Sequence, residues 1–379
     1  MISPKKKLLL LHSSNDLYGA SKIFLQLIDL LTKNGFDVHI IIPEKGMLDD
    51  FLIKKDIKIE YLELGVLRKK YLNPLGLINR LVANVKAIAF LSKYIKDHSI
   101  DLVYTNTSTI LCGGIAAKKN GVPSLFHIHE IPTGNKLYEF LSGKIINWYS
   151  SKVLTVSNSV KKHWLKYIDD KKIERIYNGI IFSKTDSLVE LERDQDDFVI
   201  TSVARIIPYK GHGYLIDIAN ELIKKSTKFK FLIVGDTLSS YVSYEKSVKQ
   251  KVKDLGLEHQ IKFLGFRNDI SGILKQSDLF IHPAIAPDPL PTVLFESLHN
   301  DLPTVATNLG GAIEILDNGN NGLLIPYNDP KKAANLINEY CTNTKLQKKH
   351  LENSKKNFKI NFSSESFNKN ILKEVNNLL

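Results

Sequence analysis

The chain has 379 residues, which is more than one compact core usually holds and suits two domains of roughly 180 residues each. Its 43% hydrophobic and 24% charged residues are ordinary for a globular protein and exclude a collagen, a long coiled coil or a largely disordered chain. Nearly all of the net charge of +12 lies in residues 1–180, where 27 Lys and Arg face 16 Asp and Glu, which indicates an anionic partner such as a membrane surface, a lipid phosphate or nucleic acid.

The first predicted strand is Leu8–Leu11, where four leucines make an apolar region too short for a signal peptide. A helix is predicted at 20–35, because Ile23 and Leu27 share one face with two later leucines and Gly35 can end the helix. No apolar run approaches the roughly 18 residues that a spanning helix needs, so we expect no membrane crossing.

Short apolar strands alternate with amphipathic helices along the rest of the chain. In the first half the predicted strands are 8–12, 36–42, 101–106, 123–129, 152–157 and 173–178. In the second half they are 197–206, 228–236, 260–266, 277–284, 303–308 and 322–327, with helices at 214–225, 243–256 and 329–341. This alternation predicts the α/β class, with parallel sheets in two doubly wound domains that face a cleft.

The two domains are predicted at residues 1–182 and 183–360. The segment 183–197 is polar and acidic without a strong period, as a linker would be, and its run Asp194–Asp196 makes a poor metal site. Residues 361–379 have helical apolar spacing, and we expect this C-terminal helix to pack back on the first domain.

The most specific segment runs from His282 to Glu314, HPAIAPDPLPTVLFESLHNDLPTVATNLGGAIE. A strand ends near His282, a proline-rich loop follows, and a helix is predicted from Pro291, because proline is favoured in a first helical turn. Asp288 and Glu296 bracket the N-terminal end of that helix, whose N–H groups and positive dipole suit a phosphate. By itself, Glu296 is equally well explained as an exposed helix residue.

This segment resembles the signature of the retaining glycosyltransferases of family four, which have the two-domain GT-B fold. The resemblance rests on an acid, seven residues and a Glu, followed by the strand PTVAT and a Gly-Gly-x-x-Glu turn. It continues in VARIIPYKGHGYLI, FLGFRNDI and YNGI, and in NDLYGAS and LFHIHE of the first half. The order of these motifs spans nearly the whole chain.

The resemblance implies a donor site in the second domain. Arg205 and Lys210 would hold the donor diphosphate and stabilise the charge that develops as it leaves. Glu296 would accept hydrogen bonds from the ribose, and Asp288 from the transferred sugar. The family more often has Glu at position 288, and glycine where this chain has Pro291, which has no N–H to donate. The predicted donor-binding residues are Gly19, Arg205, Lys210, Phe266, Arg267, Asp288, Leu290, Pro291, Thr292, Val293 and Glu296.

In the first domain the resemblance places His129 beside the donor sugar and among the catalytic residues, with Arg205, Lys210 and Asp288. His127 lies on the same strand face and competes with His129 for this position. Glu130 and Ala20 are predicted to meet the acceptor, although Glu130 can also orient a neighbour. Gly19 allows close approach to the backbone, or is an ordinary strand-to-helix turn.

Attachment to an anionic membrane is expected through the basic first domain. Residues 64–95 combine the cationic run Arg68–Lys70 with a long amphipathic helix, which suits a bilayer interface but also a core-facing helix with a solvated loop. Two cysteines, Cys112 and Cys341, make neither a disulfide framework nor a metal cluster, so a cytoplasmic location at the inner face of the membrane is expected. No nucleic-acid recognition element is found.

The sequence therefore predicts a retaining glycosyltransferase that moves a sugar from a nucleotide-diphosphate sugar to a glycan or polyprenyl-linked glycan acceptor. Neither a metal nor a cofactor is expected, since the nucleotide sugar is a co-substrate. One alternative is a nucleotide-sugar epimerase or hydrolase of the same fold, and another is a non-catalytic sugar-nucleotide-binding protein. The presence of Arg205, Lys210 and Glu296 argues against a decayed site.

Overall fold

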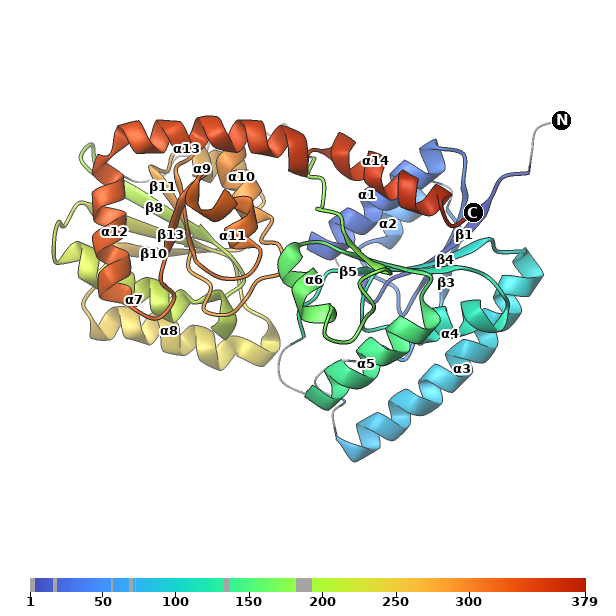
Figure 1. Cartoon of the computed structure of the whole chain (residues 1–379). Coiled ribbons are helices and arrows are strands. Elements are labelled where there is room, and N and C mark those ends of the chain that lie inside the picture. Colours follow the sequence, from blue (N-terminus) through green and yellow to red (C-terminus); the bar gives the residue numbers. More distant parts are fainter. Residues whose placement is uncertain are drawn as a thin grey trace. The chain divides into compact units, whose positions relative to one another are not determined.

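The computed structural model describes residues 4–15, 19–55, 57–67, 71, 73–132, 136–181 and 193–379. The chain forms two compact units (Figure 1): unit 1 comprises Met1–Gly179 and Phe362–Leu379, and unit 2 comprises Ile180–Asn361. The predicted boundary between residues 182 and 183 lies outside the described residues, as does most of the predicted linker.

Within its described residues, unit 1 contains a seven-stranded parallel sheet in the order β3-β2-β1-β4-β5-β6-β7. Its strands are β1 (Lys7–Leu11), β2 (Asp37–Ile42), β3 (Ile59–Tyr61), β4 (Leu102–Thr105), β5 (Ser124–Ile128), β6 (Lys152–Thr155) and β7 (Ile173–Arg175). The six predicted strands are present, and β3 was missed because this short edge strand is largely exposed and lacks an apolar run.

Helices cover both faces of this sheet (Figure 1). The helices of unit 1 are α1 (Gly19–Lys33), α2 (Asp49–Ile53), α3 (Pro74–His98), α4 (Cys112–Lys119), α5 (Lys136–Tyr149), α6 (Asn158–Trp164) and α14 (Ser364–Asn376). Leu8 and Leu10 point into the core under α1 and α14, whereas Leu9 and Leu11 point into the core under α3 and α4. This alternation explains why β1 reads as an unbroken apolar run, since a strand covered on both faces needs apolar residues at every position.

The C-terminal helix α14 is part of unit 1. Its residues Phe367, Ile371 and Val375 are buried in the core that includes α1. Lys152 of β6 pairs with Glu374 of α14 at 3.1 Å and with Glu174 at 2.8 Å, which ties the helix to the sheet.

Helix α3 is more apolar than the search for an unbroken apolar run indicated. Among the described residues it is the one helix whose length and composition would suffice to cross a membrane, with a mean hydropathy of 1.3 over 18 residues. Only 28% of that window is buried. The charged residues interspersed in α3 hid this property from a search for an unbroken apolar run.

Unit 2, as far as it is described, repeats the design with a six-stranded parallel sheet in the order β10-β9-β8-β11-β12-β13. Its strands are β8 (Phe198–Val203), β9 (Phe229–Val234), β10 (Ile261–Gly265), β11 (Leu279–His282), β12 (Thr304–Thr307) and β13 (Leu323–Ile325). Its helices are α7 (His212–Ile223), α8 (Val242–Asp254), α9 (Ile270–Lys275), α10 (Val293–His299), α11 (Ala312–Ile315), α12 (Pro330–Thr342) and α13 (Thr344–Asn357). The main core lies between the sheet and α7, α8 and α12. The predicted α/β class with two doubly wound sheets is confirmed.

Each sheet has a switch point where the strand order reverses. In unit 1 the switch lies between β1 and β4, and in unit 2 between β8 and β11. Ligands of doubly wound sheets bind outside the carboxyl ends of the strands at such points. The residues that follow these four strands are therefore the first place to look for chemistry.

Candidate functional site

At the switch point of unit 2 the structure joins two predicted site residues in an ion pair. Lys210 ends a 3-10 turn, Pro208–Lys210, shortly after β8, and Asp288 lies in the loop after β11. The Lys210 ammonium contacts the Asp288 carboxylate, and their side chains are 22% and 13% exposed. His282, the last residue of β11, places its Nε2 3.4 Å from the same carboxylate oxygen.

The charges of this cluster follow from its burial and contacts. Burial by itself raises the pKa of Asp288, but the Lys210 ammonium and the adjacent His282 together hold that pKa well below its usual range. Burial lowers the pKa of His282 and lowers that of the neighbouring His212 to about 4, with the Lys210 charge adding to both shifts. At neutral pH the site therefore holds an ionised Asp288 beside two neutral imidazoles.

The Gly-Gly turn of the motif supports the loop that carries Asp288. The Gly311 N–H donates to the Asp288 carbonyl oxygen at 2.7 Å. Gly310 has a φ of 59°, and a Cβ at this position would lie 2.4 Å from the Asp288 carbonyl oxygen. Both the left-handed backbone and the close approach require glycine here, so the motif sets the position of Asp288.

Arg205 belongs to the same cluster. It follows β8 by two residues, and its charge acts together with those of Lys210 and Asp288 on the Tyr209 hydroxyl, whose pKa is raised mainly by burial. The sequence did not single out Tyr209. The charges of two cations and one carboxylate therefore act on one phenol near the carboxyl end of β8.

Five more predicted donor residues lie on the segment after Asp288, namely Leu290, Pro291, Thr292, Val293 and Glu296. Leu290 and Pro291 are buried, and the Pro291 carbonyl accepts a hydrogen bond from the Leu294 N–H at 3.1 Å. Helix α10 starts at Val293 with Thr292 as its N-cap, two residues later than predicted, and Glu296 lies in its first turn. The Glu296 N–H reaches the Thr292 carbonyl at 3.4 Å, so these two residues share one turn.

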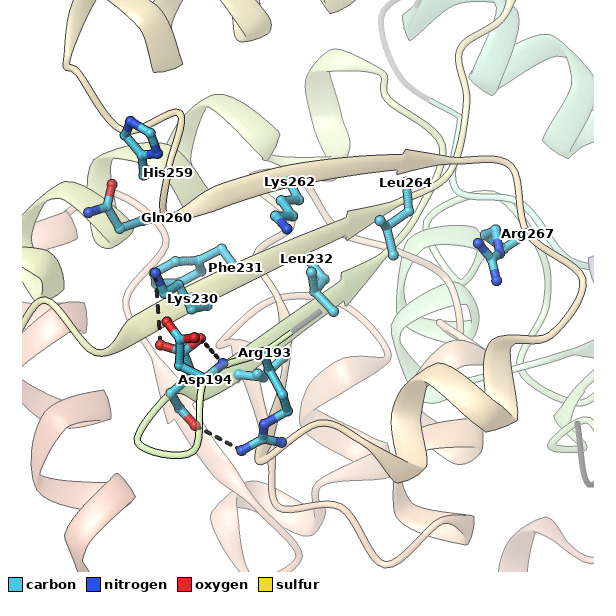
Figure 2. Close-up of a pocket in the computed structure, with 12 residues that line it drawn as sticks. Arg193, Asp194, Lys230, Phe231, Leu232, His259, Gln260, Lys262, Leu264 and Arg267 are labelled. Carbon is cyan, nitrogen blue, oxygen red and sulfur yellow. Dashed lines mark hydrogen bonds and ion pairs between the residues drawn. The ribbon is translucent and has the colours of Figure 1, made fainter. Parts of the chain in front are cut away.

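Phe266 and Arg267 lie after β10, beside a cavity that is separate from the Lys210–Asp288 pair. Phe266 is 62% exposed, and Arg267 pairs with Asp269. Arg267 also lines a cavity of about 610 Å³ over β8, β9 and β10, at the end opposite to His259 (Figure 2). None of the residues that line this cavity belongs to the Lys210–Asp288 cluster, so the cavity is separate from it.

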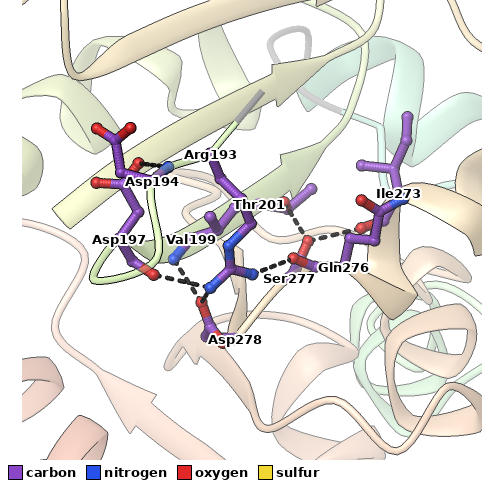
Figure 3. Close-up of polar contacts among 9 residues, drawn as sticks. All are labelled: Arg193, Asp194, Asp197, Val199, Thr201, Ile273, Gln276, Ser277 and Asp278. Atoms are coloured by element: carbon purple, nitrogen blue, oxygen red, sulfur yellow. Dashed lines mark hydrogen bonds and ion pairs between the residues drawn. The ribbon is translucent and has the colours of Figure 1, made fainter. Parts of the chain in front are cut away.

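One wall of the cavity is a fixed polar network (Figure 3). The Arg193 guanidinium donates to the carbonyl oxygens of Gln276 and Asp197, both at 2.8 Å, and to the Asp278 carboxylate at 3.1 Å. Asp278 also accepts from the Val199 N–H at 2.7 Å. These contacts fasten the end of the predicted linker to unit 2, which is a structural role.

At the switch point of unit 1 a chain of buried hydrogen bonds connects α1 with the end of β5. His129 Nε2 lies 2.9 Å from Asn106 Oδ1, Asn106 Nδ2 lies 3.2 Å from His12 Nδ1, and His12 Nε2 lies 3.1 Å from Ser21 Oγ. An amide oxygen only accepts and an amide nitrogen only donates, so with this amide orientation Nε2 carries the proton in both histidines. Gly19 and Ala20 begin α1 just before Ser21.

The two competing histidines occupy different environments. His127 lies within β5, bonds to the Tyr104 hydroxyl at 2.9 Å and packs near Phe367 in the core, and burial lowers its pKa to about 3. His129 follows the end of β5, is 9% exposed, and has a pKa held well below its usual value by burial. Of the two, His129 lies at the carboxyl edge of the sheet.

Glu130 is held by the loop after β4. Its carboxylate accepts from the Thr107 hydroxyl at 2.5 Å, from the Ser108 N–H and hydroxyl at 3.1 Å each, and from the His129 N–H at 3.2 Å. Burial raises the pKa of Glu130, whereas these hydrogen bonds lower it. The contacts give Glu130 a role in fixing the backbone of His129, and its contact with an acceptor stays a prediction.

Several residues of both clusters were not proposed from the sequence as site residues. In unit 1 they are His12, Ser21, Asn106, Thr107 and Ser108, and in unit 2 they are Tyr209, His212 and His282. Most of them are polar residues at or just after a strand end, and this signal was present in the sequence. Among the described residues, no group of three or more His, Cys, Asp or Glu has the geometry to hold a metal ion.

Two family models match the chain, and together they span residues 18–357. The model for glycosyl transferases group 1 matches residues 183–357, and the model for glycosyltransferase family 4 matches residues 18–184. The matches therefore cover the Lys210–Asp288 cluster and all of the His129 chain except His12.

Relatives and solved structures are similar over most of their length. The UDP-Gal:alpha-D-GlcNAc-diphosphoundecaprenol alpha-1,3-galactosyltransferase of Escherichia coli is 27% identical over 86% of this chain and 89% of its own. The capsular polysaccharide biosynthesis glycosyltransferase CapH of Staphylococcus aureus is 24% identical over 91% of each chain. The crystal structure of Anabaena Alr3699/HepE in complex with UDP and glucose covers 98% of this chain and 99% of its own, with a TM-score of 0.79 and 24% identity.

Proposed function

The chain belongs to the group 1 glycosyl transferases, of the family 4 type with the GT-B fold. On this premise we propose that it is a retaining enzyme that transfers a sugar from a nucleotide-diphosphate sugar to a lipid-linked glycan. It is a glycosyltransferase that acts in polysaccharide or lipid-linked glycan synthesis. The predictions of family, fold and enzyme class are confirmed.

The observation that most supports a donor-binding site in unit 2 is the Lys210–Asp288 pair at the switch point of its sheet. Without a donor, Asp288 neutralises Lys210. A bound diphosphate, with at least two negative charges, takes over Lys210 and Arg205, and Asp288 is then available to accept hydrogen bonds from hydroxyls of the sugar. The same cations stabilise the diphosphate as it leaves, which is the electrostatic part of catalysis.

The reaction exchanges one bond at the anomeric carbon for another. The bond between this carbon and the diphosphate oxygen breaks, and a bond to the acceptor hydroxyl oxygen forms on the same face of the sugar. The acceptor proton passes to the departing phosphate oxygen, so no side chain has to act as a base, and no side chain has to act as a nucleophile because the new bond forms directly on the face that the diphosphate leaves. Neutral His129 directs its Nε2 proton to Asn106, so its Nδ1 remains as the ring nitrogen that can accept a further hydrogen bond.

The donor and acceptor classes are supported by the relatives. The E. coli relative is named for UDP-galactose and for a diphosphoundecaprenol-linked acceptor, and the Anabaena protein was solved with UDP. We therefore assign a UDP-sugar to unit 2 and a polyprenyl-linked glycan to unit 1, near Ala20 and Glu130. The enzyme would act at the inner face of the cell membrane as a peripheral protein.

A binding screen followed by a transfer assay tests this function. UDP at about one hundred times its dissociation constant is expected to stabilise the protein by roughly 2.7 kcal/mol in a thermal-shift measurement, and other nucleoside diphosphates serve as controls. Transfer is then measured from UDP-sugars to a polyprenyl-diphosphate-linked sugar. Rapid donor turnover without any acceptor would instead identify an epimerase or hydrolase, and no turnover with tight UDP binding would identify a binding protein.

A further inference from the structure

The outer sides of α3 and α5 expose large apolar side chains. On α3, Leu77, Leu81 and Val85 are between 48% and 65% exposed, and on α5, Leu137, Leu141 and Trp148 are between 49% and 65% exposed. Both helices pack on α4, on the same side of the sheet of unit 1 (Figure 1). We call these six side chains the α3–α5 apolar surface.

On each helix the apolar side chains form one stripe. With 3.6 residues per turn, Leu77, Leu81 and Val85 recur every four residues along one side of α3. The buried residues Ala83 and Ala87 lie on the opposite side, toward α4. The exposed stripe of α3 is therefore not needed for the core.

The charge around this stripe is mainly positive. From Asn73 to Lys96 the chain contains no acidic residue, and Lys86 and Lys96 are exposed on α3, while Lys93 pairs with Asp97 near the C-terminal end of the helix. On α5 the acidic residue Glu139 is buried and lies 3.6 Å from His163, so it adds little negative charge to the outer side. An apolar stripe bordered by lysines complements the anionic surface of a phospholipid bilayer.

We infer that the α3–α5 apolar surface inserts into the interfacial layer of an anionic bilayer. The inference specifies the membrane attachment proposed above. Helix α3 lies in the membrane plane and does not span it, because its inner side packs on α4 and carries the buried, charged Arg80, which pairs with Glu63. The predicted cationic run Arg68–Lys70 lies outside the described residues.

The two tryptophans of the chain allow a direct test with the unmodified protein. Trp148 is 62% exposed on the surface in question, whereas Trp164 is fully buried. Vesicles of phosphatidylcholine with about one third phosphatidylglycerol are expected to shift the Trp148 emission to shorter wavelength, and bromine-labelled acyl chains to quench it. The variant Trp148→Phe should lose this response.

The substitutions Leu77→Gln, Leu81→Gln and Val85→Gln, combined, are expected to reduce sedimentation with these vesicles at least tenfold. A matched control is Met47→Gln with Ile53→Gln, which replaces exposed apolar side chains of unit 1 elsewhere and should bind as the wild type does. Raising the salt concentration or replacing phosphatidylglycerol by phosphatidylcholine should weaken wild-type binding.

Equal vesicle binding by the triple variant and the wild type would overturn the inference. So would a wild type that forms a dimer in solution, fails to bind vesicles, and becomes a monomer in the triple variant, since the surface would then join two copies. Vesicle binding is measured without donor or acceptor. A failed membrane test therefore leaves transfer to a detergent-dispersed acceptor intact, and failed transfer leaves vesicle binding intact.

Discussion

Replacing Lys210 by Ala tests the donor site and the buried pair at once. The change removes the cation from a pair whose side chains are 22% and 13% exposed and leaves Asp288 as an uncompensated buried carboxylate. Removal of one partner of a buried pair typically costs about 3–5 kcal/mol of stability, and we expect about 3 kcal/mol here because His282 still contacts the carboxylate. For a domain of this size that corresponds to a fall of roughly 6–12 °C in the melting temperature.

The double variant Lys210→Ala with Asp288→Asn separates the pair from other effects. If the two groups are coupled as the contact indicates, the double variant should be more stable than the sum of the single changes predicts, by at least about 1 kcal/mol. Calorimetry or denaturant unfolding of all four proteins gives this coupling free energy. Additive single effects would show that the two charges do not stabilise each other.

The same variants test catalysis. Because Lys210 is proposed to stabilise the departing diphosphate, Lys210→Ala should lower kcat by about 10²–10³-fold, as loss of one electrostatic contact to a developing anion does elsewhere. Asp288→Asn should restore part of the stability of Lys210→Ala without restoring transfer. Undiminished transfer by Lys210→Ala would refute the role assigned to this lysine.

Four further outcomes are expected. The pKa of Asp288 is depressed in the folded protein, so the stabilisation by this carboxylate is present above the ordinary carboxyl pKa of 3.8 and is lost as the pH falls through the lower folded value. The difference in the free energy of unfolding between wild type and Asp288→Asn, measured with urea, should therefore be constant from about pH 5 to 7 and shrink below about pH 4. His127 stays neutral in the folded protein down to a pKa of about 3, but it takes up a proton near pH 6.5 when the protein is unfolded. As the pH falls between these two values, the free energy of unfolding of the wild type should therefore decrease by about 1.4 kcal/mol more per pH unit than that of His127→Gln. Parallel pH profiles of the two proteins would contradict this. Gly211→Ala should destabilise the protein by more than Gly256→Ala. Both glycines have a left-handed φ, but only at Gly211 would an added Cβ meet another atom, the Pro283 carbonyl oxygen at 1.9 Å. Equal melting temperatures of the two variants would rule out that contact. Asn106→Ala should lower kcat about tenfold, because the Asn106 amide orients two histidines of unit 1. UDP binding, measured by calorimetry, should not change. An unchanged kcat would remove Asn106 from the mechanism.

Much of the site was visible in the sequence because its parts are local. The strand, loop and helix around Asp288 and Glu296 follow from a short apolar run, prolines and helical spacing within 33 residues, and the structure places these elements within two residues of the prediction. The Gly-Gly turn was also recognised as a motif. Its physical reason, contact of Gly310 and Gly311 with the backbone around Asp288, required coordinates.

The edge strand β3 was not predicted, and the amphipathic helix within residues 64–95 was predicted without a decision between a bilayer interface and a core-facing helix. A strand of three largely exposed residues has no apolar pattern to detect. The stripe of α3 is interrupted in sequence by charged and polar residues, and only winding into a helix brings Leu77, Leu81 and Val85 to one side.

The sequence by itself determined the α/β class, nearly all strands, and the residue types available for binding a diphosphate, because burial and backbone geometry leave periodic and local marks on a chain. The tertiary structure alone decided that Lys210 pairs with Asp288 across 78 residues, that Asn106 joins His12 to His129, and that His127 belongs to the core. Such contacts join the ends of strands that are neighbours in the sheet but distant in the chain. Sheet order brings them together, and no local pattern in the sequence records it.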